Sequence, residues 1–177
     1  MREGGDILLV HPSNQLGMHS GVPLCTAYLA AALERNGFSV QAIDLQLDSE
    51  KDLRKALRQA PRVIGVTVYA YSLLACRRIA RLARSISPRS VILLGGAQAT
   101  LDTPGTFEAI PEAHCLIQGE GDVALPAFVG HILRGASMEE CRTAVPSLRS
   151  PNTPDLLTLP DLCDIETLPF ASAAFHL

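Results

Sequence analysis

The sequence predicts an α/β protein with a doubly wound, five-stranded parallel sheet. Short apolar runs that suit strands covered on both faces recur along the chain, and segments with apolar residues at helical spacing lie between them. Most of these runs end in glycine or in residues with polar side chains. Strands that alternate with helices join through right-handed crossovers, so the pattern favours a flavodoxin-like (Rossmann-like) sheet with the strand order 2-1-3-4-5.

The N-terminal part of the chain holds the first strand, the first helix and the second strand. Residues 6–11 (DILLVH) are the first predicted strand. Gly37 is placed to end the first helix in the left-handed conformation before residues 38–44 (FSVQAID) return to strand. The helix spans residues 23–36, and its inward face is predicted to carry Cys25, Tyr28, Leu29, Ala32 and Leu33.

The second and third helices flank the third strand. Ser49 and Asp52 have the spacing of a capping box, which starts the second helix. Residues 62–68 (RVIGVTV) are apolar almost throughout, as is typical of a central parallel strand. The third helix has an apolar face and an arginine-rich face, which we interpret as a solvated outer surface. Its arginines are Arg77, Arg78, Arg81 and Arg84.

The last two predicted strands both end in glycine. Residues 90–96 (SVILLGG) are the fourth strand, and residues 114–121 (HCLIQGEG) are the fifth. A short helix is expected between them, around residues 106–110. A final helix over residues 122–134 completes the alternation.

The chain is expected to divide into a main domain, residues 1–136, and a proline-rich C-terminal part, residues 137–177. Two short apolar pieces, residues 145–149 and 156–159, flank the turn signal SPNTPD, which predicts a hairpin. The residues after it are expected to form an extended arm.

Composition and charge exclude several classes of function. Of the 177 residues, 47% are hydrophobic and 19% are charged, which is typical of a packed globular protein. The net charge is −3 and the arginines are dispersed, so a nucleic-acid partner is not expected. The apolar stretches fall short of the ~20 residues of a membrane span and of a signal-peptide core. We therefore expect a cytoplasmic protein with no membrane partner.

The predicted ligand site lies at the carboxyl ends of the strands, near the point where the strand order reverses. Four strand ends lead into the loops HPSNQLG, TVYAYS, GGAQAT and GEGD. Thr67, Tyr69 and Tyr71 supply hydroxyl groups and ring faces at one of these ends. Because the ends of parallel strands meet at one edge of a sheet, these loops are predicted to form one shared cleft.

Other functions of this fold can be compared at the same positions. A phosphoacceptor domain would carry acidic residues after the first strand and a lysine after the fifth, whereas this chain has His11 and Gln118 there. A P-loop motif is absent. Residues 119–124 (GEGDVA) match GxGxxA, but the acidic residue that a nicotinamide site needs further along is missing. Nicotinamide, flavin and a domain without cofactor remain alternatives on these grounds.

An ordered set of segments carries a resemblance to a known family. These segments are HPSN, YLAAALERNGFSVQAID, VIGVTVYAY, ILLGGAQAT and IQGEGD. In this order they resemble the cobalamin-binding domain that precedes the catalytic barrel in B12-dependent radical S-adenosylmethionine (SAM) enzymes. The segment DLCDIETLPF is similar to the family's linker into the radical domain. The resemblance implies that the nucleotide tail of cobalamin enters the carboxyl end of the sheet, with the corrin ring above it.

The resemblance implies cofactor-binding residues at all four strand ends. Gly95, Gly96 and Ala97 would line the slot for the tail, because a bulky ligand approaches the backbone only where no side chain intervenes. Leucine at Gly96 is therefore expected to abolish binding while the fold stays intact. The predicted cofactor-binding residues are Ser13, Asn14, Leu16, Gly17, Thr67, Val68, Tyr69, Tyr71, Gly95, Gly96, Ala97, Gly119, Glu120 and Gly121.

The resemblance also implies how the cobalt is held. Classical B12 methyltransferases carry a DxHxxG motif whose histidine ligates cobalt. Around His11 this chain has Leu9 and Asn14 in place of the aspartate and the glycine, so the motif is missing. Cobalamin is therefore expected in the base-off form without a protein histidine ligand, with His11 and His19 as alternative ligands.

Radical chemistry needs a CxxxCxxC motif to hold a [4Fe–4S] cluster that cleaves SAM. The five cysteines of this chain are too widely spaced to supply it. The cluster and SAM are therefore expected in a radical SAM domain that is missing here or acts in trans. This chain would be the cobalamin-binding part of an enzyme. We expect first that this enzyme is a methyltransferase, in which the chain presents methylcobalamin to the radical-generating barrel. The alternative is a free-standing cobalamin carrier or sensor without catalysis of its own.

Overall fold

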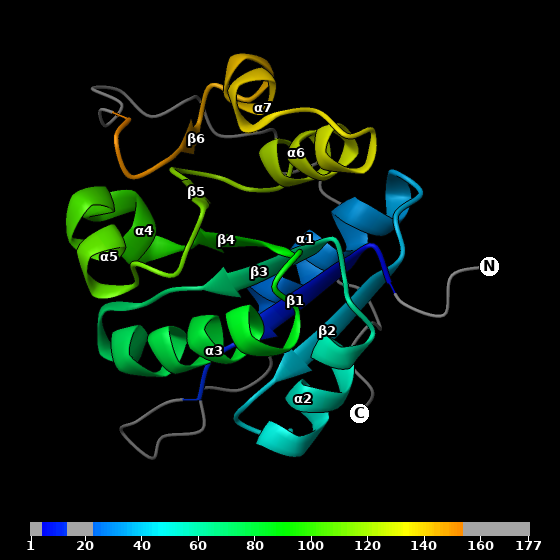
Figure 1. Cartoon of the computed structure of the whole chain (residues 1–177), viewed down its shortest axis with the longest axis vertical. Helices are drawn as coiled ribbons and strands as arrows, with labels where there is room; N and C mark the ends of the chain where they lie inside the picture. The colour runs from blue at the N-terminus through cyan, green and yellow to red at the C-terminus, as the bar shows by residue number, and fades with distance from the viewer. Residues whose placement is uncertain (1–4, 14–22, 154–177) are drawn as a thin grey trace.

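The structure is a computed structural model that describes residues 5–13 and 23–153. Six strands form one sheet in the order β2-β1-β3-β4-β5-β6 (Figure 1). The first five strands are parallel, and β6 runs antiparallel to β5. The predicted fold class and the order 2-1-3-4-5 are confirmed. The strands are β1 Ile7–His11, β2 Val40–Asp44, β3 Val63–Thr67, β4 Val91–Gly95, β5 Cys115–Ile117 and β6 Leu148–Arg149.

The sheet has one strand more than predicted. The sequence predicts residues 145–149 as half of a hairpin with residues 156–159, and the structure adds that β6, within residues 145–149, pairs with β5. Helix α7 (Met138–Ala144), which follows α6 (Ala124–Leu133), brings the chain back so that β6 runs antiparallel to β5. Residues 156–159 lie outside the described part of the chain.

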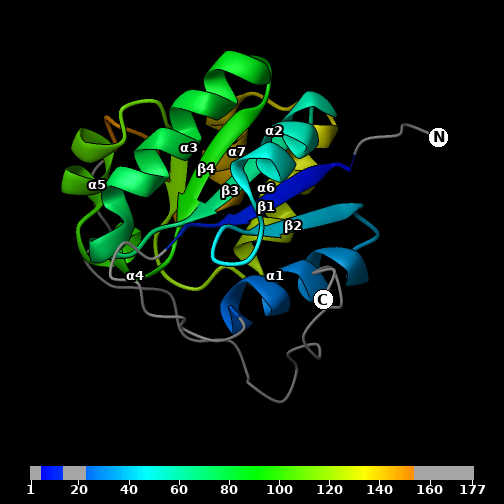
Figure 2. The same ribbon diagram turned by 90° about the horizontal axis from the view of Figure 1, so that it is seen from below.

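The helices cover the two faces of the sheet in separate layers (Figure 2). α1, α6 and α7 share a core with Ile7 and Leu9 of β1, whereas α2, α3, α4 and α5 share a core with Leu8 and Val10. This division follows from the alternation of side chains along a strand. None of the described helices is long and apolar enough to cross a membrane. The remaining helices are α1 Leu24–Arg35, α2 Glu50–Arg58, η1 Ala70–Ser72 (a 3-10 turn), α3 Leu73–Ile86, α4 Ala97–Leu101, α5 Thr103–Ala109 and α6 Ala124–Leu133.

Local signals in the sequence fix several helix ends. Gly37 has φ +81° after α1, as its placement predicts. Ser49 and Asp52 form the predicted capping box at the start of α2. Between β4 and β5 the chain forms two short helices rather than one: α4 begins directly after Gly96, and the Asp102 carboxylate then caps α5 by accepting from the Gly105 N–H at 3.0 Å.

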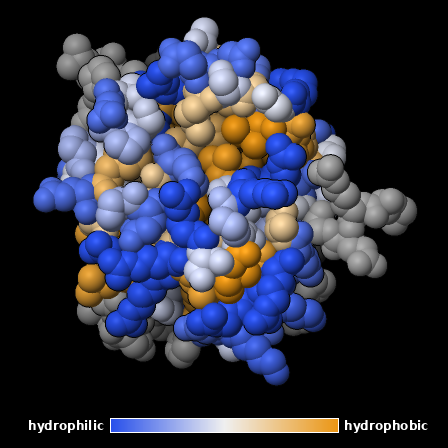
Figure 3. Space-filling model, in the orientation of Figure 1, coloured by the Kyte–Doolittle hydropathy of each residue, from blue (hydrophilic) through white to orange (hydrophobic). Residues whose placement is uncertain are grey.

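The arginine-rich side of α3 faces outward. Arg81 Nε donates to Glu112 Oε1 at 2.8 Å, and Arg77 Nε lies 3.7 Å from the same oxygen. On the face shown in Figure 3, hydrophilic side chains lie over part of the region of α3, with hydrophobic patches beside them. These contacts agree with the interpretation of a solvated, ion-paired surface.

Candidate functional site

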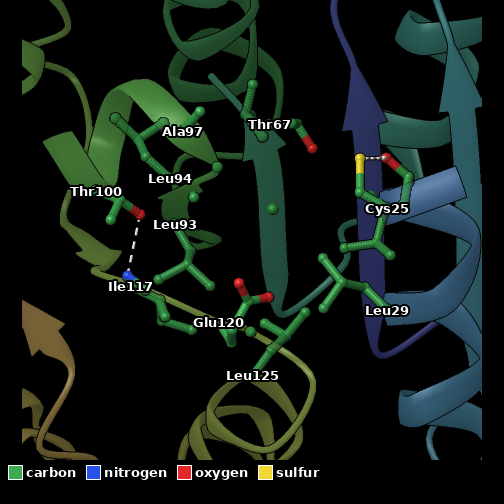
Figure 4. A pocket seen from close by; sticks show the side chains of 18 of the residues that line it. Cys25, Leu29, Thr67, Leu93, Leu94, Ala97, Thr100, Ile117, Glu120 and Leu125 are labelled. Atoms are coloured by element: carbon green, nitrogen blue, oxygen red, sulfur yellow. Dashed lines mark hydrogen bonds between the residues drawn. The ribbon is translucent and has the colours of Figure 1, made fainter. Parts of the chain in front are cut away.

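A cavity of about 590 Å³ opens at the carboxyl edge of the sheet. Its floor comes from β1, β3, β4 and β5, one wall from α1, and the opposite wall from the loop that leads into α6. Figure 4 shows Leu29 of α1, Leu93 of β4 and Leu125 of α6 around this space. The cavity lies on the sheet face that α1 and α6 cover, beside the reversal of strand order between β1 and β3.

The floor depends on a glycine in the central strand. Leu9 and Leu93 lie on either side of Gly65 in the register of the parallel strands. A Cβ added to Gly65 would lie only 2.9 Å from Leu9 Cδ2. Glycine at this position therefore gives the Leu9 side chain room to lie over β3, and a larger residue would force that side chain to shift.

The two glycines that end β4 differ in what they permit. Apart from Gly95 and its chain neighbours, no atom of the described residues lies within 4 Å of the place that a Cβ on Gly95 would occupy, so its missing side chain leaves space within the cavity. Gly96 has φ +100° and ψ −175°, a conformation that is essentially restricted to glycine. A Cβ there would also lie 3.1 Å from the Val68 carbonyl oxygen. Leucine at Gly96 would strain the backbone, so Gly95 is the better position for filling the cavity without disturbing the fold.

The loop after β5 is tied to α4 through Thr100. The Gly119 N–H donates to Thr100 Oγ1 at 3.0 Å, and Gln118 Nε2 donates to the Thr100 carbonyl oxygen at 3.3 Å. Gly119 has φ +94°, which the turn into this loop requires. A Cβ on Gly121 would lie 3.0 Å from Leu29 Cδ2 across the cavity. The loop therefore stands close to α1, and glycine at position 121 leaves room for the Leu29 side chain between them.

Tyr69 lines the cavity and contacts His11 at the end of β1. Its hydroxyl oxygen lies 3.4 Å from Cys25 Sγ, and its ring stacks on Tyr71 at a centroid distance of 5.2 Å. The ring of His11 meets it edge-on at 5.9 Å. Burial, together with the neighbouring Cys25, raises the pKa of Tyr69, so the phenol stays protonated. Burial lowers the pKa of His11, against the opposing charge of Asp44.

The interior of the cavity is apolar and its charged groups lie nearer the mouth. Glu120 is exposed and Asp122 is half-buried; both are acidic, and the described lining carries no basic side chain. The floor residues Leu9, Leu93 and Leu125 are at most 4% exposed. Pockets of this kind enclose an uncharged group and orient it through a few polar contacts.

The structure brings many of the predicted site residues together and separates others. Val68 is buried in the core on the opposite sheet face, and Tyr71 stacks behind Tyr69. Ser13 is half-buried and does not line the cavity. The predicted residues outside the described part of the chain are Asn14, Leu16 and Gly17. Those that line the cavity are Thr67, Tyr69, Gly95, Gly96, Ala97, Gly119, Glu120 and Gly121.

Sequence reasoning missed the wall that α1 contributes. Its predicted inward face includes Cys25, Tyr28 and Leu29, but Cys25 and Tyr28 are exposed and Leu29 is half-buried. All three line the cavity, while Ala30 and Leu33 make the core contacts of this helix. The only sequence signal for this wall was the width of the apolar face of α1, which is broader than the contacts of the helix with the core require.

The fold and the cavity define a doubly wound α/β domain with an apolar cavity at the carboxyl edge of its sheet. Comparison with known families is more specific. The B12 binding domain family matches residues 19–129, which is more than half of the chain. The chain therefore belongs to the B12-binding domain family, and the predicted family is confirmed.

Curated relatives include a cyclase and two methyltransferases. An anaerobic magnesium-protoporphyrin IX monomethyl ester cyclase of Rubrivivax gelatinosus is 25% identical over 146 residues, which are 76% of this chain and 26% of that protein. An uncharacterized methyltransferase of Pyrococcus horikoshii is 26% identical over 75% of this chain and 30% of its own length. The cytidylyl-2-hydroxyethylphosphonate methyltransferase of Streptomyces wedmorensis is 24% identical over 76% of this chain and 30% of its own length. This chain thus spans less than a third of these relatives.

Among solved structures, a response regulator protein from Burkholderia pseudomallei matches with a TM-score of 0.48 and 19% sequence identity. The match covers 78% of this chain and 70% of that chain.

Proposed function

We propose that this chain holds cobalamin by its nucleotide arm and presents it to a radical SAM domain, as the cofactor-binding part of a methyltransferase. The observation that carries the proposal is the open space in front of Gly95, inside a cavity at the carboxyl edge of the sheet. A volume of about 590 Å³ suits a ligand of drug size, and cobalamin is larger than that. One arm of the cofactor therefore enters, and the corrin ring stays outside.

The residues present fit such an arm. Leu93, Ile117 and Leu125 offer an apolar surface for a heterocyclic base. Thr67 and Thr100 stand higher in the cavity, are half-buried, and carry hydroxyl groups that can serve the sugar. A side chain larger than glycine at Gly95 would fill the space that the arm needs.

The enzymatic part of the proposal is supported by the relatives. Two of them are named methyltransferases, and each is more than three times the length that this chain matches. Catalytic groups would then lie in another part of a longer polypeptide or in a partner, which would also hold the [4Fe–4S] cluster and SAM. When bound, cobalamin would supply a methyl group for transfer. The residues of this chain bind the cofactor, orient it and exclude water from its buried arm.

We extend the proposal to the cobalt, which would have no histidine ligand from this chain and would leave the cofactor in the base-off form. His11 supports this because it packs against Tyr69 and does not line the cavity. The electron paramagnetic resonance spectrum of the reduced complex is expected to lack nitrogen splitting from a protein ligand. Splitting that disappears in His11→Gln or His19→Gln would overturn this part.

Binding itself is tested by mixing the purified chain with hydroxocobalamin, removing free cofactor on a desalting column and recording the corrin absorbance. About one corrin per chain is expected. A chain that leaves the column without corrin would overturn the proposal. The radical part is tested separately, since the reading frame that encodes this chain, or a protein that copurifies with it, is expected to contain CxxxCxxC. Corrin retention without such a motif in either place would leave a cobalamin carrier.

A further inference from the structure

The deep part of the cavity has few groups that can form hydrogen bonds. Leu9, Leu93, Ile117 and Leu125 reach it from the core layer beneath α1 and α6, and each is at most 4% exposed. Thr26 on α1 is the one polar side chain among the described lining residues that is buried to the same degree. A ligand group that reaches this depth therefore meets hydrocarbon on almost every side.

The backbone groups of the floor already form hydrogen bonds within the sheet. Leu9 pairs with Gly65, and Gly65 pairs with Leu93, within the parallel ladder of β1, β3 and β4. The amide and carbonyl groups of a central parallel strand are used by its neighbours. The floor thus provides shape and apolar surface, but it does not provide donors or acceptors for a heterocycle.

We propose that this cavity selects among corrinoids by the base at the end of the nucleotide arm, accepting a benzimidazole and rejecting a purine such as adenine. This inference rests on the proposed function. A dimethylbenzimidazole presents methyl groups and carbon edges to Leu93, Ile117 and Leu125. Adenine adds an amino group and further ring nitrogens, which would lose their water without gaining partners at this depth. One such unpaired group is enough to weaken binding by about tenfold, or about 1.4 kcal/mol.

Thr26 offers a single hydroxyl group at the depth of the floor, and the other polar groups of the cavity do not offset this preference. Thr67, Tyr69 and Thr100 are half-buried and Glu120 is exposed, so all four stand nearer the mouth than the floor does. At that height they can meet the sugar and the linker amide, which corrinoids with either base share. They therefore strengthen the binding of both corrinoids equally, and the apolar floor determines which base is preferred.

The test compares three corrinoids by equilibrium dialysis against the full 177-residue chain. They are cobalamin, the corrinoid with adenine as its base, and cobinamide, which lacks the nucleotide. Cobalamin is expected to bind at least about tenfold more tightly than either of the others. Equal binding of cobalamin and the adenine form would overturn the inference and leave the proposed function standing. Equal binding of cobinamide and cobalamin would overturn the placement of the arm, and with it the inference. Binding of none of the three would overturn the proposed function itself.

A pair of matched variants locates the discrimination on the floor. Leu125→Gln places an amide at the base of the cavity and is expected to narrow the ratio between cobalamin and the adenine form. Leu133→Gln makes the same change at the end of the same helix, outside the cavity lining, and is expected to leave the ratio unchanged. Far-UV circular dichroism checks that both variants are folded. If a folded Leu125→Gln variant keeps the original ratio between the affinities for cobalamin and the adenine form, the assignment of discrimination to the floor is overturned. If that variant does not fold, the comparison of the three corrinoids on the unmodified chain decides the inference.

Discussion

Filling the space in front of Gly95 is the most direct test of cofactor binding. Gly95 ends β4 without a left-handed φ, and among the residues that the structure describes only its own chain neighbours come within 4 Å of a Cβ built there. Gly95→Leu therefore places its side chain into the cavity rather than into packed protein. Leucine also suits a strand better than glycine does, so the free energy of unfolding is expected to stay the same or rise by about 0.5–1 kcal/mol.

The size of the effect on binding follows from the volume of the cavity. An engineered cavity left by removing one leucine side chain measures about 150 Å³, so the added side chain would take about a quarter of the 590 Å³ here. A ligand arm that fits the unmodified cavity would then be overpacked, which costs about 1–3 kcal/mol. The dissociation constant for cobalamin is expected to rise by about 5- to 150-fold.

The assay is equilibrium dialysis with hydroxocobalamin, paired with urea denaturation of the same preparations. Gly95→Ala is the graded control, because a single methyl group meets open space and is expected to change the Kd little. Cobinamide is the second control, since a ligand without the arm has nothing to lose when the cavity is filled. A folded Gly95→Leu variant that binds cobalamin with the original Kd would refute the placement of the arm. A variant that no longer unfolds cooperatively would refute the claim that this space is free.

Three further substitutions test other parts of the structure. Gly96→Ala is expected to lower the free energy of unfolding by about 1–3 kcal/mol because alanine is strained at φ +100°; urea curves that match those of Gly95→Ala would contradict the strain. Thr100→Val removes the acceptor for the Gly119 N–H, so we expect a loss of about 1 kcal/mol and weaker cobalamin binding, whereas unchanged stability and Kd would show that this bond does not fix the loop. His11→Gln tests a pH effect: burial holds the pKa of His11 below its ordinary value of 6.5, so the unfolded chain takes up the proton first. This contribution to stability is complete above about pH 6.5 and is lost as the pH falls below it, so the variant should lose less stability than the unmodified chain between about pH 7.5 and 5.5. Equal losses in urea denaturation would contradict this assignment.

The order of the parallel strands could be predicted because each strand and helix unit is long enough to show its period. The apolar run of β3 marks a central strand, and β1 supplies side chains to both cores as alternation requires. The C-terminal part behaves differently. Helix α7 has seven residues and β6 has two, which is too short for either period to appear in the sequence. The pairing of β6 with β5 depends on where α6 places the following residues in space. A local sequence pattern does not contain that information.

The cavity could be predicted at its strand ends but not along its walls. Thr67 and Tyr69 line it, while Val68 between them faces the other core, as expected of neighbours along an extended chain. On α1 the periodicity placed Cys25 and Leu29 on the inward side, and they do face the cavity. Sequence periodicity shows which side of a helix points to the interior, but it does not show whether that interior is filled with protein or left open.

Three glycines shape this cavity because they have no side chain. Gly65 gives Leu9 room over the central strand, Gly95 leaves space at the end of the next strand, and Gly121 keeps the loop after β5 clear of Leu29. These three glycines come from separate units of the fold and meet only at the carboxyl edge of the sheet. The function proposed here is to hold and orient a cofactor, which needs a shaped volume and few reactive groups. A cavity lined mainly by leucine, isoleucine and glycine, with its few polar groups near the mouth, meets that need without catalytic side chains of its own.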